Sequence, residues 1–103
     1  MFEFIKKIFG GSSVNYKELV NKGAVIVDVR SKAEYNAGHI SGSKNIPLDT
    51  IRTTITELKK LNNPIITVCR SGARSGMAKG ILKSSGIEAY NGGPWISLKN
   101  KIA

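Results

Sequence analysis

The sequence predicts an α/β domain built on a mostly parallel sheet. Two segments, "AVIVDV" at 24–29 and "PIITVC" at 64–69, are continuous apolar runs rich in β-branched residues. Such runs are typical of parallel strands that are covered on both faces. Segments with helical spacing lie before, between and after them, which is typical of this fold class. The length of 103 residues fits a single domain.

Two helices are expected around the first strand. Segment 15–23, "NYKELVNKG", has apolar residues on one face and ends at Gly23, a common helix terminator. Segment 31–38, "SKAEYNAG", is expected to be a short helix with Ser31 as its N-cap and Gly38 as its terminator.

The second half of the chain adds three helices and a strand. Segment 49–63 carries isoleucine and leucine at helical spacing, and we expect Asp49 to cap this helix. A helix is expected over 75–86, followed by a short strand at 87–91 and a final helix at 95–102.

The N-terminal residues are expected to form a unit of their own. We assign 1–12 to an amphipathic arm and 13–103 to the domain. The arm has apolar residues at helical spacing, but Lys6 and Lys7 interrupt it, and it lacks the continuous apolar centre of a secretory signal. Attachment of the arm to a membrane surface is the alternative. No apolar run approaches a transmembrane span, so we expect a cytoplasmic chain.

The charge balance favours anionic substrates or partners. Sixteen basic and seven acidic residues give a formal net charge of +9. The lysines are scattered and not interleaved with aromatic residues, so a specific nucleic-acid module is not expected. One cysteine excludes an internal disulfide, and one cysteine with one histidine argues against a zinc site. We expect a monomer with no metal and no cofactor.

The stretch "VCRSGARS" at 68–75 holds the candidate site. Cys69 falls at the carboxyl end of a predicted central strand, where open α/β sheets bind ligands. The amides after it can curl around one point, a helix begins nearby, and Arg70 and Arg74 add two positive charges. Each of these features favours a thiolate. A structural cysteine ending a buried strand is the alternative, but it does not require two arginines.

Glycine and serine residues near Cys69 fit an anion-binding loop. Gly72 allows the backbone to turn without a Cβ, and Ser71 and Ser75 can donate hydroxyl hydrogen bonds. Gly92 and Gly93 are expected to permit a tight backbone path close to this loop.

The chain resembles single-domain rhodaneses, a thiosulfate sulfurtransferase-like family, over residues 13–102. Three stretches carry the resemblance in the family order and spacing: "VIVDVRSKAEYNAGHISGSKNIP" (25–47), "ITVCRSGARSGMAKGILKSSG" (66–86) and "AYNGGPW" (89–95). The resemblance implies a central parallel sheet of about five strands with helices on both faces.

The resemblance also implies a sulfur-transfer mechanism. Cys69 would take the sulfane sulfur of thiosulfate as a persulfide and pass it to an acceptor. Arg70 and Arg74 would bind the charged oxygens of the donor. The loop that would hold the substrate and the persulfide anion consists of Arg70, Ser71, Gly72, Ala73, Arg74 and Ser75.

Residues outside this loop are expected to have structural roles. By the resemblance, Asp28 and Arg30 support the loop and pair locally, with Glu34 as a helix-spaced partner of Arg30. His39 is expected in a hydrogen-bonded turn, and Trp95 in the core or at a pocket rim.

Three functions remain open from the sequence. The first is a turnover sulfurtransferase, the second a carrier that receives a persulfide from a partner and hands it on, and the third a cysteine phosphatase or arsenate reductase. Cysteine phosphatases place five residues between cysteine and arginine, whereas four separate Cys69 from Arg74. The shorter loop favours a single sulfur over a phosphate. No second cysteine can resolve a persulfide, so the acceptor, whether cyanide, a thiol or a protein dithiol, is external.

Overall fold

The computed structural model describes residues 14–103, in which helices and strands alternate. The predicted arm, 1–12, lies outside the described residues, and its boundary with the domain stays a prediction. The strands are β1 (Val25–Asp28), β2 (Lys44–Asn45), β3 (Ile65–Cys69) and β4 (Ala89–Pro94). The helices are α2 (Tyr16–Asn21), α3 (Lys32–Ala37), the 3-10 helix η2 (Leu48–Thr54), α4 (Ile55–Leu61), α5 (Ala73–Ser84) and α6 (Trp95–Ile102).

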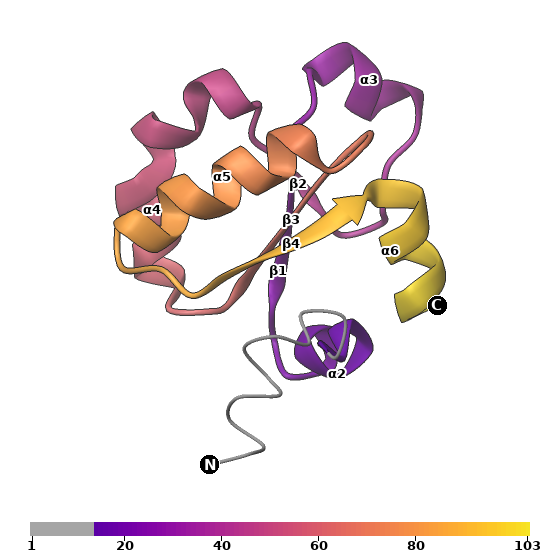
Figure 1. Ribbon diagram of the computed structural model, residues 1–103, viewed down its shortest axis with the longest axis horizontal. Helices are drawn as coiled ribbons and strands as arrows, with labels where there is room; N and C mark the ends of the chain where they lie inside the picture. The colour runs from indigo at the N-terminus through magenta and orange to yellow at the C-terminus, as the bar shows by residue number, and fades with distance from the viewer. Residues whose placement is uncertain (1–13) are drawn as a thin grey trace.

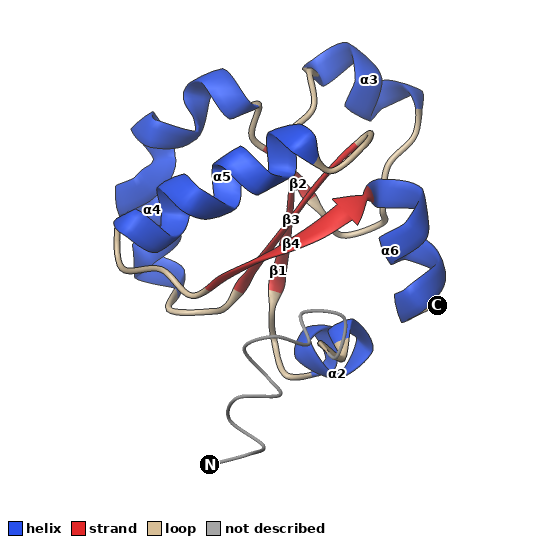
Figure 2. Cartoon of the chain, viewed as in Figure 1, coloured by secondary structure: helices blue, strands red, loops and turns tan. Residues whose placement is uncertain are grey.

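The sheet is parallel throughout, in the order β2-β1-β3-β4. β1 pairs with β2 and β3, and β3 pairs with β4. The carboxyl ends of these strands therefore meet at one edge, with the loops to α3 and α5 beside them (Figure 2). Cys69 ends β3 and so lies at this edge.

Helices cover both faces of the sheet, as predicted. α4 and α5 lie on one side, and α2 and α6 lie on the other (Figure 1). Successive strand residues point to opposite faces. Val27 and Ile65 belong to the core cluster that contains Leu82 of α5. Ile66 belongs to the second cluster, with Leu98 of α6. Helices cover both faces of the sheet, so strand residues on both faces are apolar, which explains the continuous apolar runs in the sequence.

The sheet differs from expectation in its number of strands, which is four in residues 14–103 and not about five. The described residues before Gly23 contribute α2 and add no strand. Asn15 caps α2 by accepting a hydrogen bond from the backbone N–H of Glu18 at 3.0 Å. β2 is only two residues long, and Pro47, which cannot donate to a ladder, follows it closely.

The segment 49–63, predicted as one helix, is divided between two kinds of helix. It begins as the 3-10 helix η2 and continues as α4, and Asp49 is not its N-cap. The hydroxyls of Thr50, Thr53 and Thr54 donate to carbonyls three residues earlier, at 2.9, 2.7 and 2.8 Å. These short-range bonds compete with regular α-helical geometry in this segment.

A β-bulge interrupts the pairing of β3 with β4. Between Thr67 and Val68, the partner residue on β4 changes from Asn91 to Gly93, which leaves Gly92 as an extra residue. A Cβ on Gly92 would lie only 2.8–3.0 Å from atoms of β3. The tight backbone path predicted at this glycine is confirmed.

We expect Gly92→Ala to destabilise the fold by about 1–3 kcal/mol, because the added methyl group has no room against β3. The matched control is Gly80→Ala on α5, where a Cβ meets nothing within 4 Å. This control should stabilise the helix by about 0.5–1 kcal/mol. Urea unfolding measures both changes, and equal stabilities of the two variants would contradict the packing described for Gly92.

Candidate active site

Hydrogen-bond donors converge on the sulfur of Cys69. The side chain is buried, with no exposed surface. The backbone N–H of Gly72 donates to Sγ at 2.9 Å, and that of Ser75 at 3.4 Å. The Ser75 hydroxyl lies 3.3 Å from the same sulfur. The loop thus forms the cradle around one point that the sequence predicts, and the point is the sulfur atom itself.

The sulfur of Cys69 serves as the N-terminal cap of α5. Gly72 occupies the N-cap position with φ 101° and has no side chain to accept a hydrogen bond. The first N–H groups of a helix have no acceptor within the helix. Here Sγ accepts from Ser75, the third residue of α5, where an N-cap side chain normally accepts. The positive end of α5 is therefore directed at the sulfur, which favours its anionic form.

The environment of Cys69 shifts its ionisation. Burial raises the pKa of the thiol. The hydrogen bonds that the Ser75 hydroxyl and the amides of Ser75, Gly72 and Ser71 offer to the thiolate lower it further than burial raises it, so the pKa lies below its ordinary value. A lower pKa increases the fraction of thiolate, the nucleophilic form, near neutral pH.

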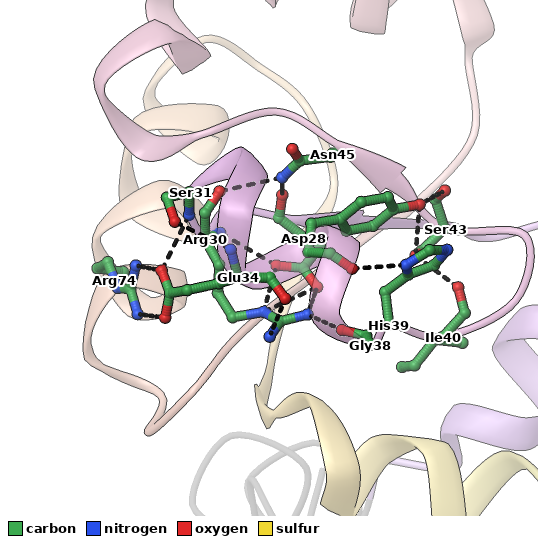
Figure 3. A network of polar contacts seen from close by, with 11 residues as sticks. Asp28, Arg30, Ser31, Glu34, Gly38, His39, Ile40, Ser43, Asn45 and Arg74 are labelled. Carbon is green, nitrogen blue, oxygen red and sulfur yellow. Dashed lines mark hydrogen bonds and ion pairs between the residues drawn. The ribbon is translucent and has the colours of Figure 1, made fainter.

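A buried ion pair at the end of β1 holds α3 in place (Figure 3). Arg30 Nη2 lies 2.8 Å from Asp28 Oδ2, and both side chains are almost fully buried. The same guanidinium donates to the carbonyls of Glu34 at 3.3 Å and Gly38 at 2.7 Å. It also lies 4.7 Å from the ring centroid of Trp95. Each of these partners satisfies part of a charge that would be costly to bury alone.

The carboxylate of Glu34 pairs with Arg74, and the predicted pair with Arg30 is wrong. Arg74 Nη1 and Nη2 donate to the two oxygens of Glu34 at 2.7 and 3.0 Å. Arg30 reaches only the backbone of Glu34, because Asp28 occupies its guanidinium. Glu34 also accepts from the backbone N–H of Ser31 in a capping box at the start of α3. Figure 3 shows Glu34 between Ser31 and Arg74.

The two arginines of the loop thus have different surroundings. Arg74 is held by a bidentate pair in which the side chains are 37% and 33% exposed. Arg70 is exposed, and among residues 14–103 no carboxylate forms an ion pair with it. Of the two predicted donor-binding guanidinium groups, Arg70 is the one that the described carboxylates leave unpaired.

The remaining predicted residues take simpler positions. Ser71 and Ala73 are exposed, and Ala73 is the first residue of α5. His39 Nδ1 lies 2.7 Å from the carbonyl oxygen of Tyr35, and the two rings stack at 3.7 Å between centroids. These contacts fit the structural role expected for His39.

Asn91 of β4 contacts the loop and was missed by the sequence analysis. Its Nδ2 donates to the carbonyl of Gly72 at 3.1 Å, and its Oδ1 accepts from the Ser75 hydroxyl at 2.6 Å. Oδ1 also accepts from the backbone N–H of Gly93 at 2.9 Å. An asparagine directly before a glycine is a common turn signal, and its side chain often bonds the backbone two residues on. That signal was present, but it does not show which loop the side chain contacts.

The described residues offer neither a cluster of metal ligands nor a helix that could span a membrane. In residues 14–103, no group of three or more histidine, cysteine, aspartate or glutamate side chains is arranged to hold a metal ion. None of the helices in this part of the chain has the length and hydropathy needed to cross a bilayer.

The fold and the site together define a class of protein. It is a parallel α/β domain in which a buried cysteine ends a central strand and caps the following helix. The sequence matches the rhodanese-like domain family over residues 13–93. The chain therefore belongs to the rhodanese-like domain family, and the resemblance noted from its motifs is confirmed.

Individual relatives agree with this assignment. Thiosulfate sulfurtransferase GlpE of Ectopseudomonas mendocina is 36% identical over 73% of this chain and 69% of its own length. YrkF of Bacillus subtilis, named as a proposed sulfur carrier protein, is 40% identical over 61% of this chain and 34% of its own length. A rhodanese-like domain protein from Staphylococcus aureus has a TM-score of 0.68 at 34% identity, over 81% of this chain and 86% of that chain.

The names of two of these relatives, GlpE and YrkF, refer to the transfer or carriage of sulfur. The chain spans 34–69% of the length of the first three curated relatives it matches.

We expect the pair of Glu34 with Arg74 to make stability depend on pH. The hydrogen bonds from Arg74 and Ser31 lower the pKa of Glu34 from 4.5 to about 2. The contribution of the carboxylate is therefore complete above about pH 5 and is lost as the pH falls toward 2. Glu34→Gln should lower the urea midpoint at neutral pH, and its difference from the wild type should shrink as the pH is lowered.

Glu57→Gln is the control, because Glu57 is exposed on α4 and has no ion pair within residues 14–103. If Glu34→Gln and Glu57→Gln had the same small effect at every pH, the pair with Arg74 would not contribute to stability.

Proposed function

We propose that this domain is a sulfurtransferase that moves a sulfane sulfur through a persulfide on Cys69. The observation that carries the proposal is the convergence of N–H donors on Sγ, from Gly72 at 2.9 Å and from Ser75 at 3.4 Å. Donors positioned in advance around one sulfur favour a thiolate before transfer and a persulfide anion after it. Relatives named thiosulfate sulfurtransferases support the same chemistry.

The first half-reaction needs neither a proton nor an oxidant. The Cys69 thiolate attacks the terminal sulfur of thiosulfate, and a new S–S bond forms. The S–S bond of thiosulfate breaks, and its electron pair leaves with sulfite. The persulfide on Cys69 carries the negative charge. Covalent catalysis divides the transfer into two steps in this way.

The second half-reaction restores the enzyme. A nucleophilic acceptor, such as cyanide or a thiolate, attacks the outer sulfur of the persulfide. The S–S bond breaks, and its electron pair returns to Cys69 as thiolate. The products are thiocyanate or the persulfide of the acceptor. Because Cys69 is the only cysteine of the chain, no internal thiol competes for the sulfur.

The buried position of the sulfur favours small donors. Cys69 has no exposed surface, so a donor whose reacting atom is terminal, as in thiosulfate or a persulfide, fits better than a bulky one. The loop also argues against phosphatase chemistry, because its amides are directed at a single sulfur atom and not at a larger phosphate group. A carrier that receives a persulfide from a partner is the second candidate, and the naming of YrkF favours it.

We propose different roles for the two loop arginines. Arg70 is exposed and unpaired by the described carboxylates, so it binds the charged oxygens of the donor. Arg74 is held by Glu34 and fixes the start of α5 to α3. Asp28 and Arg30 act one step further away, by holding α3 on the end of β1.

Intact-protein mass after incubation with thiosulfate tests the proposed function. We expect the reduced protein to gain the mass of one sulfur atom and to lose it on addition of cyanide, with release of thiocyanate. Cys69→Ser should gain nothing. Loading only from a persulfide-bearing protein would favour the carrier. No loading from either source, together with hydrolysis of an aryl phosphate, would overturn sulfur transfer.

Steady-state kinetics with thiosulfate test the roles of the arginines. We expect Arg70→Ala to raise KM about tenfold or more with a smaller change in kcat, because a charge-assisted hydrogen bond to the donor is lost. Arg52→Ala, on the exposed surface of η2, controls for the lost net charge. Arg74→Ala should instead lower the urea midpoint. An unchanged KM in Arg70→Ala would remove this residue from donor binding.

A further inference from the structure

The orientation of the Asn91 carboxamide is fixed by two backbone groups of opposite polarity. The carbonyl of Gly72 can only accept, so the atom 3.1 Å from it is the amide nitrogen. The N–H of Gly93 can only donate, so the atom 2.9 Å from it is the oxygen. This oxygen also lies 2.6 Å from the hydroxyl of Ser75. Because a carbonyl oxygen cannot donate, Ser75 must donate its proton to Asn91.

The Ser75 hydroxyl has one proton and two neighbours that can accept it. The second neighbour is the sulfur of Cys69, at 3.3 Å. While Asn91 holds the proton of the hydroxyl, Oγ presents only lone pairs to the sulfur. A thiol S–H can donate to those lone pairs, whereas a thiolate cannot use them. Neither Cys69 nor Ser75 has exposed surface, so the direction of this one O–H matters for the sulfur.

We propose that Asn91 is a positioning residue that sets the direction of the Ser75 hydroxyl. By accepting the hydroxyl proton, Asn91 keeps Ser75 from donating to Cys69 until the thiol ionises. In the resting thiol, Cys69 S–H donates to Ser75 Oγ and Ser75 O–H donates to Asn91 Oδ1. When Cys69 ionises, its proton leaves to solvent base and the Ser75 O–H turns to the sulfur. The N–H of Gly93 still donates to Oδ1, so Asn91 is not left without a partner.

Asn91 is itself held in place from several elements. Its backbone carbonyl accepts from the hydroxyl of Tyr16 on α2 at 2.9 Å. The bulge at Gly92 follows it directly. On α5, a Cβ at Gly76 would lie 3.2 Å from Nδ2, so the helix approaches the amide closely. These contacts allow the carboxamide little freedom to turn its oxygen away from Ser75.

The charged groups around Cys69 do not change in this switch. They come from the loop itself, from α3 and α5, and from the end of β1. They are Arg70, the Glu34–Arg74 pair and the Asp28–Arg30 pair. Opposite the sulfur, β4 contributes Asn91, Gly93 and Pro94, none of which titrates. The effect assigned to Asn91 is therefore separable from nearby charges.

Alkylation of Cys69 by iodoacetamide as a function of pH tests the proposal, because no other cysteine reacts. In Asn91→Ala, the Ser75 hydroxyl is free to donate to the thiolate. Ionisation of Cys69 costs the wild type its Ser75–Asn91 hydrogen bond and costs the variant none. We therefore expect the pKa of Cys69 to fall by up to about one unit, the size of one neutral hydrogen bond. A purely structural role for Asn91 predicts the opposite, since a loosened loop would lose amide donors and raise the pKa.

Two further variants keep the test decisive if Asn91→Ala folds poorly. Asn91→Asp preserves the shape and the acceptor oxygen, holds the Ser75 proton more strongly and adds a negative charge, so it should raise the pKa of Cys69. In a Ser75→Ala background, replacing Asn91 with alanine should leave the pKa unchanged. Three results would overturn the proposal. They are a higher pKa of Cys69 in Asn91→Ala, a lower pKa in Asn91→Asp, or a fall in pKa on Asn91→Ala that is as large in the Ser75→Ala background as in the wild type.

The inference concerns the cysteine on which the proposed function rests, but the two fail separately. Alkylation uses no sulfur donor, so a protein that does not react with thiosulfate still reports the pKa of Cys69. A protein that transfers sulfur normally while Asn91→Ala raises this pKa would retain the proposed function and lose the role of Asn91.

Discussion

The hydrogen bonds from the first turn of α5 to the sulfur of Cys69 are the interaction on which the site depends. Gly72 offers α5 no side-chain cap, and the sulfur takes that place. The contact joins the central strand to the helix that follows it. Because a hydrogen bond strengthens when its acceptor is charged, the same contact serves folding and reactivity. A thiolate or a persulfide anion is thus a better cap than a neutral thiol.

The ion pairs around this contact fix the position of α3 beside the site. Arg30 and Arg74 each have a carboxylate of their own, Asp28 and Glu34. α3 is therefore fixed both to the end of β1 and to the start of α5. The positive groups near Cys69 that have no carboxylate partner among the described residues are the N–H groups at the start of α5 and the exposed guanidinium of Arg70. The paired charges thus hold the structure, and the unpaired charge of Arg70 is left for the donor.

The sequence predicted what depends on hydrophobic pattern and failed where distant segments meet or where side chains bond the nearby backbone. The buried strands and the place of Cys69 follow from continuous apolar runs, because such runs need cover on both faces. The pair of Glu34 with Arg74 joins residues forty positions apart. The contacts of Asn91 depend on a bulge at Gly92 that no periodicity shows. In η2, hydrogen bonds from threonine side chains outweighed the helical spacing of the apolar residues.

The bulge in β4 also affects how this domain meets other chains. β4 is an outer strand of the sheet in residues 14–103, and an outer strand invites another chain to extend the sheet. The bulge breaks its regular ladder, and Pro94, opposite Cys69, has no backbone N–H to offer. Irregular, proline-bearing edges discourage intermolecular strand pairing. The border of the sheet nearest the cysteine is therefore a poor template for aggregation.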